Sequence, residues 1–361
     1  EANRSAEKFA EALRAIHEAL KLRRDWQEAV YLRKRIVGEH INLLMKEYLL
    51  DFSKGQRPDG PPHQVATRFA TGLGAHYEYA LCSFSTKSHL PLLRTLAASA
   101  RKHFSGRIYL LLIDSDDATL LPEDITPVRI SDVIDPSVWQ EMVQRYNILE
   151  LCCTLKPFLM RYVARATGGP VVYLDADTYL LGSLSPSLPD NPNFSAFLTP
   201  HLLHPFSGGR HVEELGMLRV GIYNAGLVGV GVDADALRFL DWWADRVHRY
   251  AYDAPEHGVF TDQKWIDLVP SFFQNVQTSR DIGLNVGPWR IHSEQDFAED
   301  ATGRLTFSGT PIKLMHVSRF NPDKPDMLTS YLPHARTTDS VLGRFLRRYA
   351  LEVIENRQHR K

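Results

Sequence analysis

The chain has 361 residues, a formal net charge of −1 and three cysteines, and 44% of its residues are hydrophobic. This length suits one large domain with an appended segment, and the hydrophobic share is ordinary for a globular protein. The near-zero charge argues against a nucleic-acid partner, and three cysteines are too few for a disulfide framework or a zinc site. No apolar run reaches the length of a membrane span. We therefore expect a globular chain in a reducing cytoplasm.

The first 52 residues are predicted to form an α-helical hairpin. Apolar side chains recur at helical spacing in residues 5–22 and again in residues 25–52, with charged residues on the other sides. Such apolar stripes need a cover, which either the main domain or a second copy of the chain could supply. A homodimer through the hairpin is therefore one alternative. Residues 53–76 are rich in glycine and proline and are predicted to form a linker.

From residue 77 onward, short apolar runs that predict strands alternate with longer amphipathic runs that predict helices. The predicted order is a strand at 79–84, a helix at 90–103, a strand at 108–113, helices at 137–151 and 154–166, and a strand at 171–175. This alternation favours an α/β fold with a mixed, mostly parallel sheet and helices on both faces.

The most informative stretch is 171–181, an apolar run followed by Asp175 and Asp177. A continuously apolar run behind Gly and Pro is typical of a strand buried on both faces. Two carboxylates at its end are costly unless something pairs with them, and a hard divalent cation that also contacts phosphate oxygens is a natural partner. Ligands of such sheets bind beyond the carboxyl ends of the strands, where residues 82–85 and Asp114 are also expected. An exposed Asp-x-Asp turn is the structural alternative.

The pattern is less regular after the paired acids. Residues 199–211 are predicted to form a loop over the site, and glycines within 223–229 would let the backbone approach a ligand. Helices are predicted at 235–252 and from 260–265 onward, and a short strand leads into His316. The basic, amphipathic helix at 340–361 either packs on the protein or lies on an anionic membrane surface. The second alternative would place the protein on the inner face of the membrane.

Read in order, the strand with Asp-x-Asp, the Asn-Ala-Gly at 224–226, the Asp-Gln at 262–263 and the late histidine form one set. The set resembles the retaining glycosyltransferases of the GT-A fold, in particular the family-eight type of glycogenin and of a lipopolysaccharide galactosyltransferase. Longer strings resemble a group of bacterial glycosyltransferases; they lie at 149–157, 198–201, 223–226, 239–243, 261–270 and 314–322. The resemblance covers about 77–330, and it implies a Rossmann-like GT-A domain, expected at 77–335. The hairpin (1–52) and the C-terminal helix (336–361) lie outside it.

The resemblance implies metal-dependent transfer of a sugar, with retention, from a nucleotide-sugar donor to a glycan, lipid or protein acceptor. A UDP-sugar is the expected donor. Asp175, Asp177 and His316 would hold Mn²⁺ or Mg²⁺. Gln263 and Asp262 would be the catalytic residues at the sugar. The implied donor-binding set is Cys82, Ser83, Phe84, Asp114, Lys156, Asp175, Ala176, Asn224, Ala225, Gly226 and Arg319.

Several alternatives stay open. The glycine and the Lys-Pro-Trp that follow the family-eight histidine are replaced here, so either Arg319 or Lys324 would contact phosphate. Lys156 could instead be an exposed lysine at a helix end, and Asp262 could cap a helix. Residues His201, His204 and His211 have no assigned role.

Two other functions fit part of the pattern. A haloacid-dehalogenase-like phosphatase would use Asp175 as nucleophile and Asp177 as acid and base. A non-enzymatic sugar-binding or scaffold protein would use the hairpin as its interaction surface.

Overall fold

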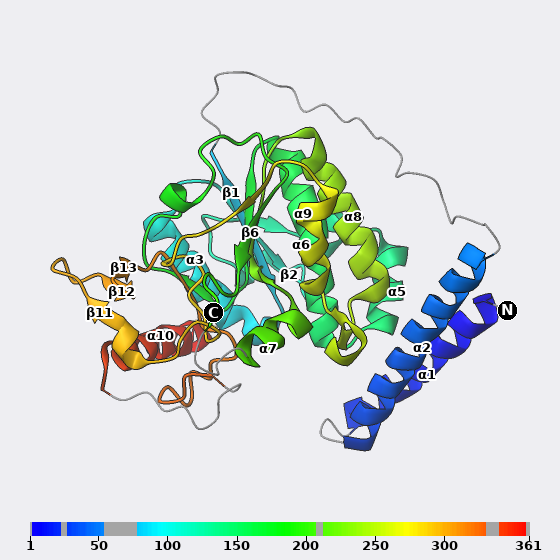
Figure 1. The fold of residues 1–361 in the computed structure, drawn as a ribbon. Coiled ribbons are helices and arrows are strands. Elements are labelled where there is room, and N and C mark those ends of the chain that lie inside the picture. The colour runs from blue at the N-terminus through cyan, green and yellow to red at the C-terminus, as the bar shows by residue number, and fades with distance from the viewer. Residues whose placement is uncertain (1, 23–26, 54–77, 207–211, 330–338, 359–361) are drawn as a thin grey trace.

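The computed structural model describes residues 2–22, 27–53, 78–206, 212–329 and 339–358 (Figure 1). The helices are α1 (Ala2–Leu22), α2 (Gln27–Ser53), α3 (Leu90–His103), α4 (Ile130–Val133), α5 (Pro136–Arg145), α6 (Ile148–Thr167), α7 (Val212–Val220), α8 (Ala234–Tyr250), α9 (Val269–Phe272) and α10 (Val341–Gln358). The strands are β1 (Ala80–Ser85), β2 (Ile108–Leu112), β3 (Thr126–Val128), β4 (Val171–Leu174), β5 (Thr178–Leu180), β6 (Ala196–Pro200), β7 (Tyr223–Val230), β8 (Asp253–Ala254), β9 (Val259–Phe260), β10 (Val276–Thr278), β11 (Phe297–Glu299), β12 (Leu305–Phe307), β13 (Thr310–Pro311) and β14 (Leu314–His316).

A seven-stranded sheet forms the centre of the molecule, in the order β10-β6-β7-β4-β1-β2-β3. The pairings β4–β1, β1–β2, β2–β3 and β10–β6 are parallel, whereas β7 runs antiparallel to both of its neighbours. This confirms the predicted α/β fold with a mixed, mostly parallel sheet. Helices α6 and α8 cover one face and α3 lies on the other (Figure 1).

Strand β4 shows why its sequence is apolar throughout. Val171 and Tyr173 point into the core shared with α6 and α8, and Val172 and Leu174 point into the core shared with α3. Successive side chains of a strand face opposite sides, so a strand covered on both faces needs apolar residues at every position. The first polar positions therefore come where the strand ends, at the carboxyl edge of the sheet.

The late strand β14 returns to this edge. It pairs antiparallel with β5, which follows the acids, and places His316 opposite Thr178. A pairing between residues more than 130 positions apart thus brings the histidine beside the Asp-x-Asp turn.

The predicted break between helices at 151–154 was wrong. Helix α5 ends at Arg145, and α6 runs without interruption from Ile148 to Thr167. Asn147 sets this start, because its side chain accepts a hydrogen bond from the Glu150 N–H (3.0 Å) while the Glu150 carboxylate accepts from the Asn147 N–H (3.1 Å). Such a reciprocal cap satisfies the first free N–H groups of a helix and is a strong start signal.

The N-terminal hairpin forms as predicted, and the chain's own domain covers it. Leu13 and Val37 are buried in the same core as β4 and α6, and Phe9 packs edge-on against Tyr252 at 6.0 Å. Arg33 forms a buried ion pair with Glu150 at the start of α6. The domain thus covers part of the hairpin, while Val30, Tyr31 and Met45 of α2 stay 42%, 69% and 56% exposed. Residues 54–76 of the expected linker lie outside the described residues.

Of the two alternatives for the C-terminal helix, the structure supports packing on the protein. Leu346 and Tyr349 of α10 are fully buried, and Tyr349 meets Tyr179 edge-on at 5.6 Å. The apolar side of α10 thus packs on the domain and against α3 instead of offering an amphipathic surface. Three of its arginines pair with acids of the same chain: Arg344 with Glu299, Arg347 with Asp339 at 2.7 Å, and Arg357 with Asp323.

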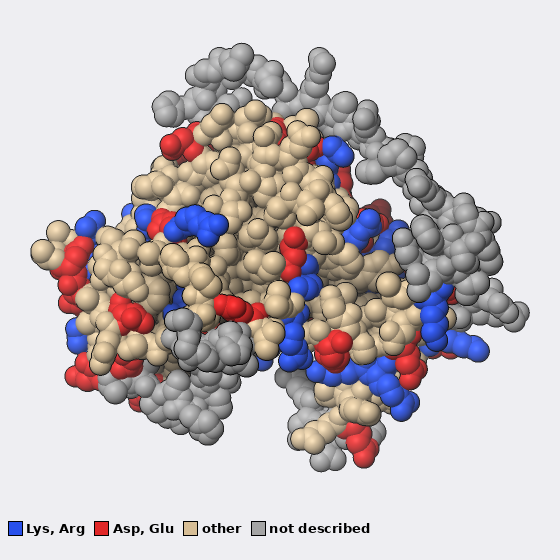
Figure 2. All heavy atoms as spheres, viewed as in Figure 1, with Lys and Arg blue, Asp and Glu red and all other residues tan. Residues whose placement is uncertain are grey.

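Within the described residues, no helix combines the length and the apolar character needed to cross a bilayer. Figure 2 shows basic and acidic side chains interspersed along the lower half of one face, in keeping with the net charge of −1.

Candidate active site

The Asp-x-Asp turn sits at the carboxyl end of β4. The Asp175 N–H donates to the Gly226 carbonyl of β7 (2.9 Å), and the Thr178 N–H and hydroxyl both donate to the Asp175 carbonyl (3.0 and 2.8 Å). These bonds close a tight turn between β4 and β5. Both carboxylates remain accessible, with 27% and 28% of their side chains exposed.

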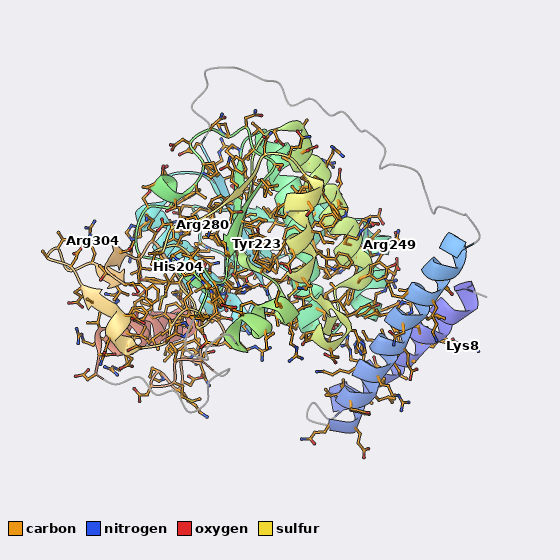
Figure 3. The ribbon with its side chains drawn as sticks, viewed as in Figure 1. Lys8, His204, Tyr223, Arg249, Arg280 and Arg304 are labelled. Atoms are coloured by element: carbon orange, nitrogen blue, oxygen red, sulfur yellow. The ribbon has the colours of Figure 1, made fainter. Side chains whose placement is uncertain are left out.

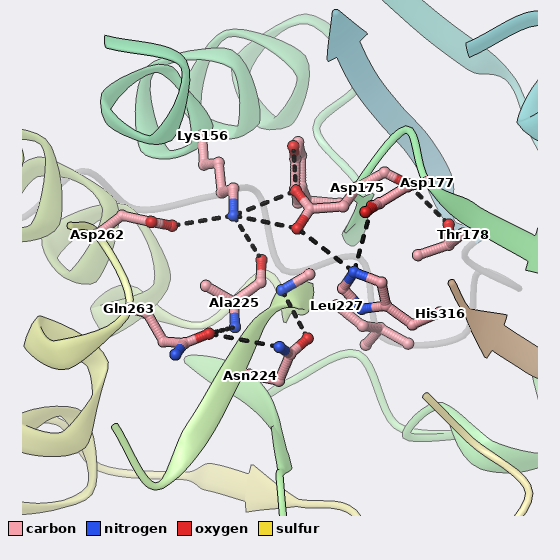
Figure 4. Close-up of polar contacts among 12 residues, drawn as sticks. Lys156, Asp175, Asp177, Thr178, Asn224, Ala225, Leu227, Asp262, Gln263 and His316 are labelled. Atoms are coloured by element: carbon pink, nitrogen blue, oxygen red, sulfur yellow. Dashed lines mark hydrogen bonds and ion pairs between the residues drawn. The ribbon is translucent and has the colours of Figure 1, made fainter. Parts of the chain in front are cut away.

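Asp175, Asp177 and His316 each offer a ligand atom, and the three atoms lie within 4.8 Å of one another (Figure 4). The His316 Nε2 is 3.2 Å from the Asp177 Oδ1 and 4.0 Å from the Asp175 Oδ2. Burial opposes protonation of the imidazole, yet the Asp177 and Asp175 carboxylates together outweigh burial and raise the pKa of His316. Two carboxylates and an imidazole that attract a positive charge to one point fit a divalent cation such as Mn²⁺ or Mg²⁺.

Gly226 leaves room for the His316 ring. A Cβ at this position would lie 2.2 Å from the His316 Cε1 and 2.7 Å from its Nδ1. The sequence predicted that glycines in this stretch let the backbone approach a ligand. In the structure, the group that lies against Gly226 is the His316 ring. No larger residue fits at 226 without moving the ring.

Lys156 lies in the interior of α6 and is buried, so the alternative of an exposed lysine at a helix end is wrong. Its Nζ contacts the Asp175 Oδ1 (3.2 Å), the Asp262 Oδ2 (3.1 Å) and the Ala225 carbonyl (3.1 Å). Its hydrogen bonds go to the Ala225 carbonyl and the Asp175 carboxylate, whereas its contact with the buried Asp262 Oδ2 is an ion pair. Burial lowers the pKa of Lys156, but the two carboxylates outweigh it and the net shift is upward.

Tyr173 fixes the orientation of Asp175. Its buried hydroxyl donates to the Asp175 Oδ1 at 2.8 Å, the oxygen that Lys156 also contacts. The Oδ2 lies between the two cationic neighbours, 3.5 Å from the Lys156 Nζ and 4.0 Å from the His316 Nε2. Sequence reasoning missed this tyrosine because a continuously apolar strand offers no signal that separates it from an ordinary core residue.

The helix predicted to open at 260–265 was wrong. Strand β9 ends at Phe260, Thr261 has a left-handed φ of 45°, and a 3₁₀ turn over Lys264–Leu268 precedes the single turn of α9. The left-handed residue interrupts a helix. Asp262 is not a cap either, because its side chain turns inward to Lys156. Burial raises the pKa of Asp262, and Lys156 partly offsets that rise.

Gln263 is buried, and both ends of its side-chain amide form hydrogen bonds. Its Oε1 accepts from the Ala225 N–H (3.2 Å) and from the Asn224 Nδ2 (3.4 Å), and its Nε2 donates to the Val220 carbonyl (3.0 Å). The structure thus brings Gln263, Asn224, Ala225 and Asp262 to the same edge as the acids (Figure 4).

The side chains expected along the nucleoside lie deeper than predicted. Cys82 and Ser83 are fully buried, and Phe84 is 6% exposed. Cys82 and Phe84 pack in the core beside Tyr173, because β1 is a central strand covered on both faces. Their side chains do not form an accessible surface. Ala176 is partly buried.

Asp114 lies exposed at the end of β2 and accepts a hydrogen bond from the Lys87 N–H (2.8 Å), which ties the loop after β1 to β2. Near it, a cavity of about 400 Å³ opens at the carboxyl ends of β2 and β3, lined by residues that include Asp116, Asp117 and Arg129. Sequence reasoning missed this cavity, because a loop of acids has no distinguishing pattern.

Arg319 departs from the glycine that the resemblance implies, yet it keeps a backbone conformation that favours glycine. It occupies the position where the family-eight loop carries glycine, and its φ of 53° lies in the left-handed region that favours glycine. Its side chain is exposed, as is that of Lys324.

Of the unassigned histidines, His201 is buried and bonded to the Asn224 Nδ2 (3.2 Å), and burial lowers its pKa to about 3. It is therefore a neutral structural residue. His204 is exposed (Figure 3), and His211 lies outside the described residues.

No known family model matches the chain. Among curated proteins it is similar to two uncharacterised proteins of Bacillus subtilis (strain 168). YfnF is 25% identical over 223 residues, covering 59% of this chain and 72% of YfnF. YfnD is 26% identical over 249 residues, covering 66% and 77%.

Among solved structures, the chain is similar to the galactosyltransferase LgtC in complex with donor and acceptor sugar analogs. The TM-score is 0.45 at 17% identity, with 75% of this chain and 95% of LgtC covered. It is also similar to the glycosyltransferase GlyE of Streptococcus pneumoniae TIGR4, with a TM-score of 0.44 at 14% identity over 77% and 63% of the chains. These likenesses are distant, so an argument for function has to come from the site itself.

Proposed function

We propose that this protein is a metal-dependent GT-A glycosyltransferase that transfers a sugar from a nucleotide-sugar donor, with retention, to a glycan, lipid or protein acceptor. The observation that carries the proposal is the convergence of Asp175, Asp177 and His316 at the carboxyl edge of the sheet. Beside them lies a buried Lys156 that joins Asp175 to Asp262. Each of these residues belongs to a motif of the resemblance, and the motifs meet in space.

The three ligand residues would hold Mn²⁺ or Mg²⁺. A cation there supplies positive charge for the diphosphate of the donor as the sugar departs. A UDP-sugar is the donor we propose to test first. The loops after β2 and β3 lie at the same edge of the sheet, and with Asp114 they would contact the nucleoside.

Lys156 acts as a positioning residue in this proposal, not as a donor contact. Its Nζ already contacts Asp175, Asp262 and the Ala225 carbonyl at 3.1–3.2 Å, so a sugar or a phosphate would compete with these contacts. Its effect is to hold Asp175 and Asp262 at a fixed separation and to oppose the rise that burial causes in the pKa of Asp262. Asp262 and Gln263 would then face the donor sugar, with Asn224, Ala225 and Gly226 forming the floor.

The reaction exchanges one bond at the anomeric carbon for another. The bond between that carbon and the phosphate oxygen breaks, and a bond to the acceptor oxygen forms on the same face. The acceptor hydroxyl passes its proton to the departing phosphate. This scheme uses no covalent nucleophile: Asp262 pairs with Lys156, and Asp175 and Asp177 would hold the cation.

The test is release of nucleoside diphosphate from a panel of nucleotide sugars. We expect Mn²⁺ to support release, excess EDTA to abolish it, and Asp177→Ala to lower it on the order of 100-fold, because a direct ligand is lost. Asp124→Ala is the matched control, an exposed acid that pairs with Arg101 away from the site. Full release in EDTA would refute the metal role. Release of inorganic phosphate from a phosphomonoester would favour the phosphatase alternative.

A further inference from the structure

Asn285 lies behind the proposed cation ligands and is fully buried. Main-chain bonds place it there: the Val286 N–H donates to the Leu314 carbonyl (2.9 Å), and the His316 N–H donates to the Val286 carbonyl (2.8 Å). The segment therefore runs beside β14, with residue 285 next to the ring of residue 316. The φ of Asn285 is 55°, a left-handed conformation that asparagine tolerates better than most residues.

The side-chain amide of Asn285 has three partners. Its Nδ2 donates to the Thr199 Oγ1 (2.8 Å) and to the Asn224 Oδ1 (3.0 Å). Its Oδ1 lies 3.1 Å from the His316 Nδ1. Both hydrogens and the oxygen are thus engaged, and the amide cannot rotate by half a turn without losing these bonds.

A chain of donors and acceptors assigns the proton on His316. The Gly226 N–H can only donate, and it donates to the Asn224 Oδ1 at 3.0 Å, so that atom is an acceptor. The Asn285 atom facing it must then be the NH₂ group, which leaves the Asn285 oxygen toward His316. An oxygen there requires the His316 Nδ1 to carry a hydrogen. In the neutral ring, the lone pair is then on Nε2, the atom that faces the two carboxylates.

The remaining sides of the ring are also confined. Trp289 meets His316 edge-on at 5.1 Å, and Gly226 lies against its Cε1. The hydrogen bond from Asn285 therefore adds a proton assignment to a ring whose position packing already restricts.

We infer that Asn285 is a positioning residue that holds the proton of His316 on Nδ1 and presents Nε2 to the cation. The inference rests on the proposed metal site. Outer partners of this kind raise the affinity of a histidine ligand, and their loss typically lowers metal affinity 10–100-fold. Through Asn224 the same network reaches Gln263, so the ligand and the sugar-side amide share one set of hydrogen bonds.

The experiment measures Mn²⁺ binding by titration calorimetry, without any nucleotide. We expect Asn285→Ala to weaken binding about 10-fold or more. Asn275→Ala is the control, because Asn275 also has a left-handed φ and a side-chain bond, to Asp233, but lies on another edge of the sheet. It should bind Mn²⁺ as the parent does.

A double-mutant cycle separates positioning from a merely structural role. In a His316→Ala background, Asn285→Ala should no longer change the affinity, because its effect passes through the ring. A folded Asn285→Ala protein that binds Mn²⁺ within twofold of the parent overturns the inference, as does an undiminished effect in the His316→Ala background.

If Asn285→Ala does not fold, Asn285→Asp decides. It keeps an oxygen acceptor for Nδ1–H, so we expect an affinity within threefold of the parent; a tenfold loss in the folded variant would overturn the inference. If the parent itself does not bind Mn²⁺, it is the proposed metal site that fails.

Discussion

Replacing Lys156 by methionine should destabilise the fold through the two carboxylates it leaves behind. Methionine keeps most of the side-chain volume, so little packing is lost. Only 6% of the Lys156 side chain and 2% of that of Asp262 are exposed, so solvent cannot replace the missing ammonium. Removing one partner of a buried ion pair costs about 3–5 kcal/mol. For a chain of this length that corresponds to a fall in melting temperature of about 4–7 °C.

The sign of the pH dependence follows from Asp262. Its pKa in the folded protein is raised by burial, and Lys156 is the main influence that lowers it. Without Lys156 the pKa rises further. When folding raises the pKa of a carboxyl, the protonated carboxyl stabilises the folded state at any pH below the unfolded pKa of about 3.9. This contribution to stability is lost as the pH rises through the pKa of the folded state. The deficit of Lys156→Met should therefore be largest near pH 8 and shrink toward pH 5.

Urea unfolding of the metal-free protein, in EDTA and at several pH values, measures this deficit. Lys313→Met is the matched control, because Lys313 pairs with Asp281 at 2.6 Å but is 22% exposed. We expect that variant to lose less than about 1 kcal/mol. A similar loss in both variants, or a Lys156→Met deficit that grows on acidification, would refute the reasoning.

Three further predictions concern single side chains. Gly226→Ala should weaken Mn²⁺ binding about 10-fold by calorimetry, since its Cβ would displace the His316 ring, while Gly216→Ala, with open space around it, should not. Gln263→Ala should lower kcat for sugar transfer more than it raises KM, because we expect its contact with the sugar to form chiefly in the transition state. If kcat and KM changed by equal factors, Gln263 would instead be a contact of the bound substrate. Leu346→Ala should cost about 2–5 kcal/mol in urea unfolding, and the parent should not sediment with anionic liposomes, because α10 is part of the core.

The sequence predicts those features of the site that depend on local pattern. A continuously apolar run must end somewhere, and the acids at the end of β4 therefore mark the carboxyl edge of a buried strand. Local pattern does not show how deeply a polar side chain is buried. Lys156 is one of several polar residues on α6, and only the packing of that helix on the sheet shows that it is buried between two acids.

The same limit explains Asn285 and α10. Asn285 reaches His316 only because β14 pairs with β5 and the segment before it runs alongside, which no spacing in the sequence encodes. The amphipathic pattern of α10 predicts that one side is apolar, but the pattern is the same whether a membrane or α3 covers that side. Asp175, Asp177 and His316 were predicted to lie together because of the order of the motifs in the resemblance. The periodicity of apolar residues does not predict this proximity.

The Arg33–Glu150 pair makes the hairpin more than a detachable module. Glu150 also caps α6 and accepts a hydrogen bond from the Asp253 N–H (2.8 Å), so Arg33 is the countercharge of a carboxylate inside the helix that carries Lys156. A protein trimmed to start at residue 78 would keep that carboxylate and lose its cation. Trimming at this domain boundary would thus weaken the start of α6, the helix that carries Lys156. A loss of transfer activity in such a truncated protein would therefore indicate a disturbed α6, and would not by itself indicate that a binding partner is missing.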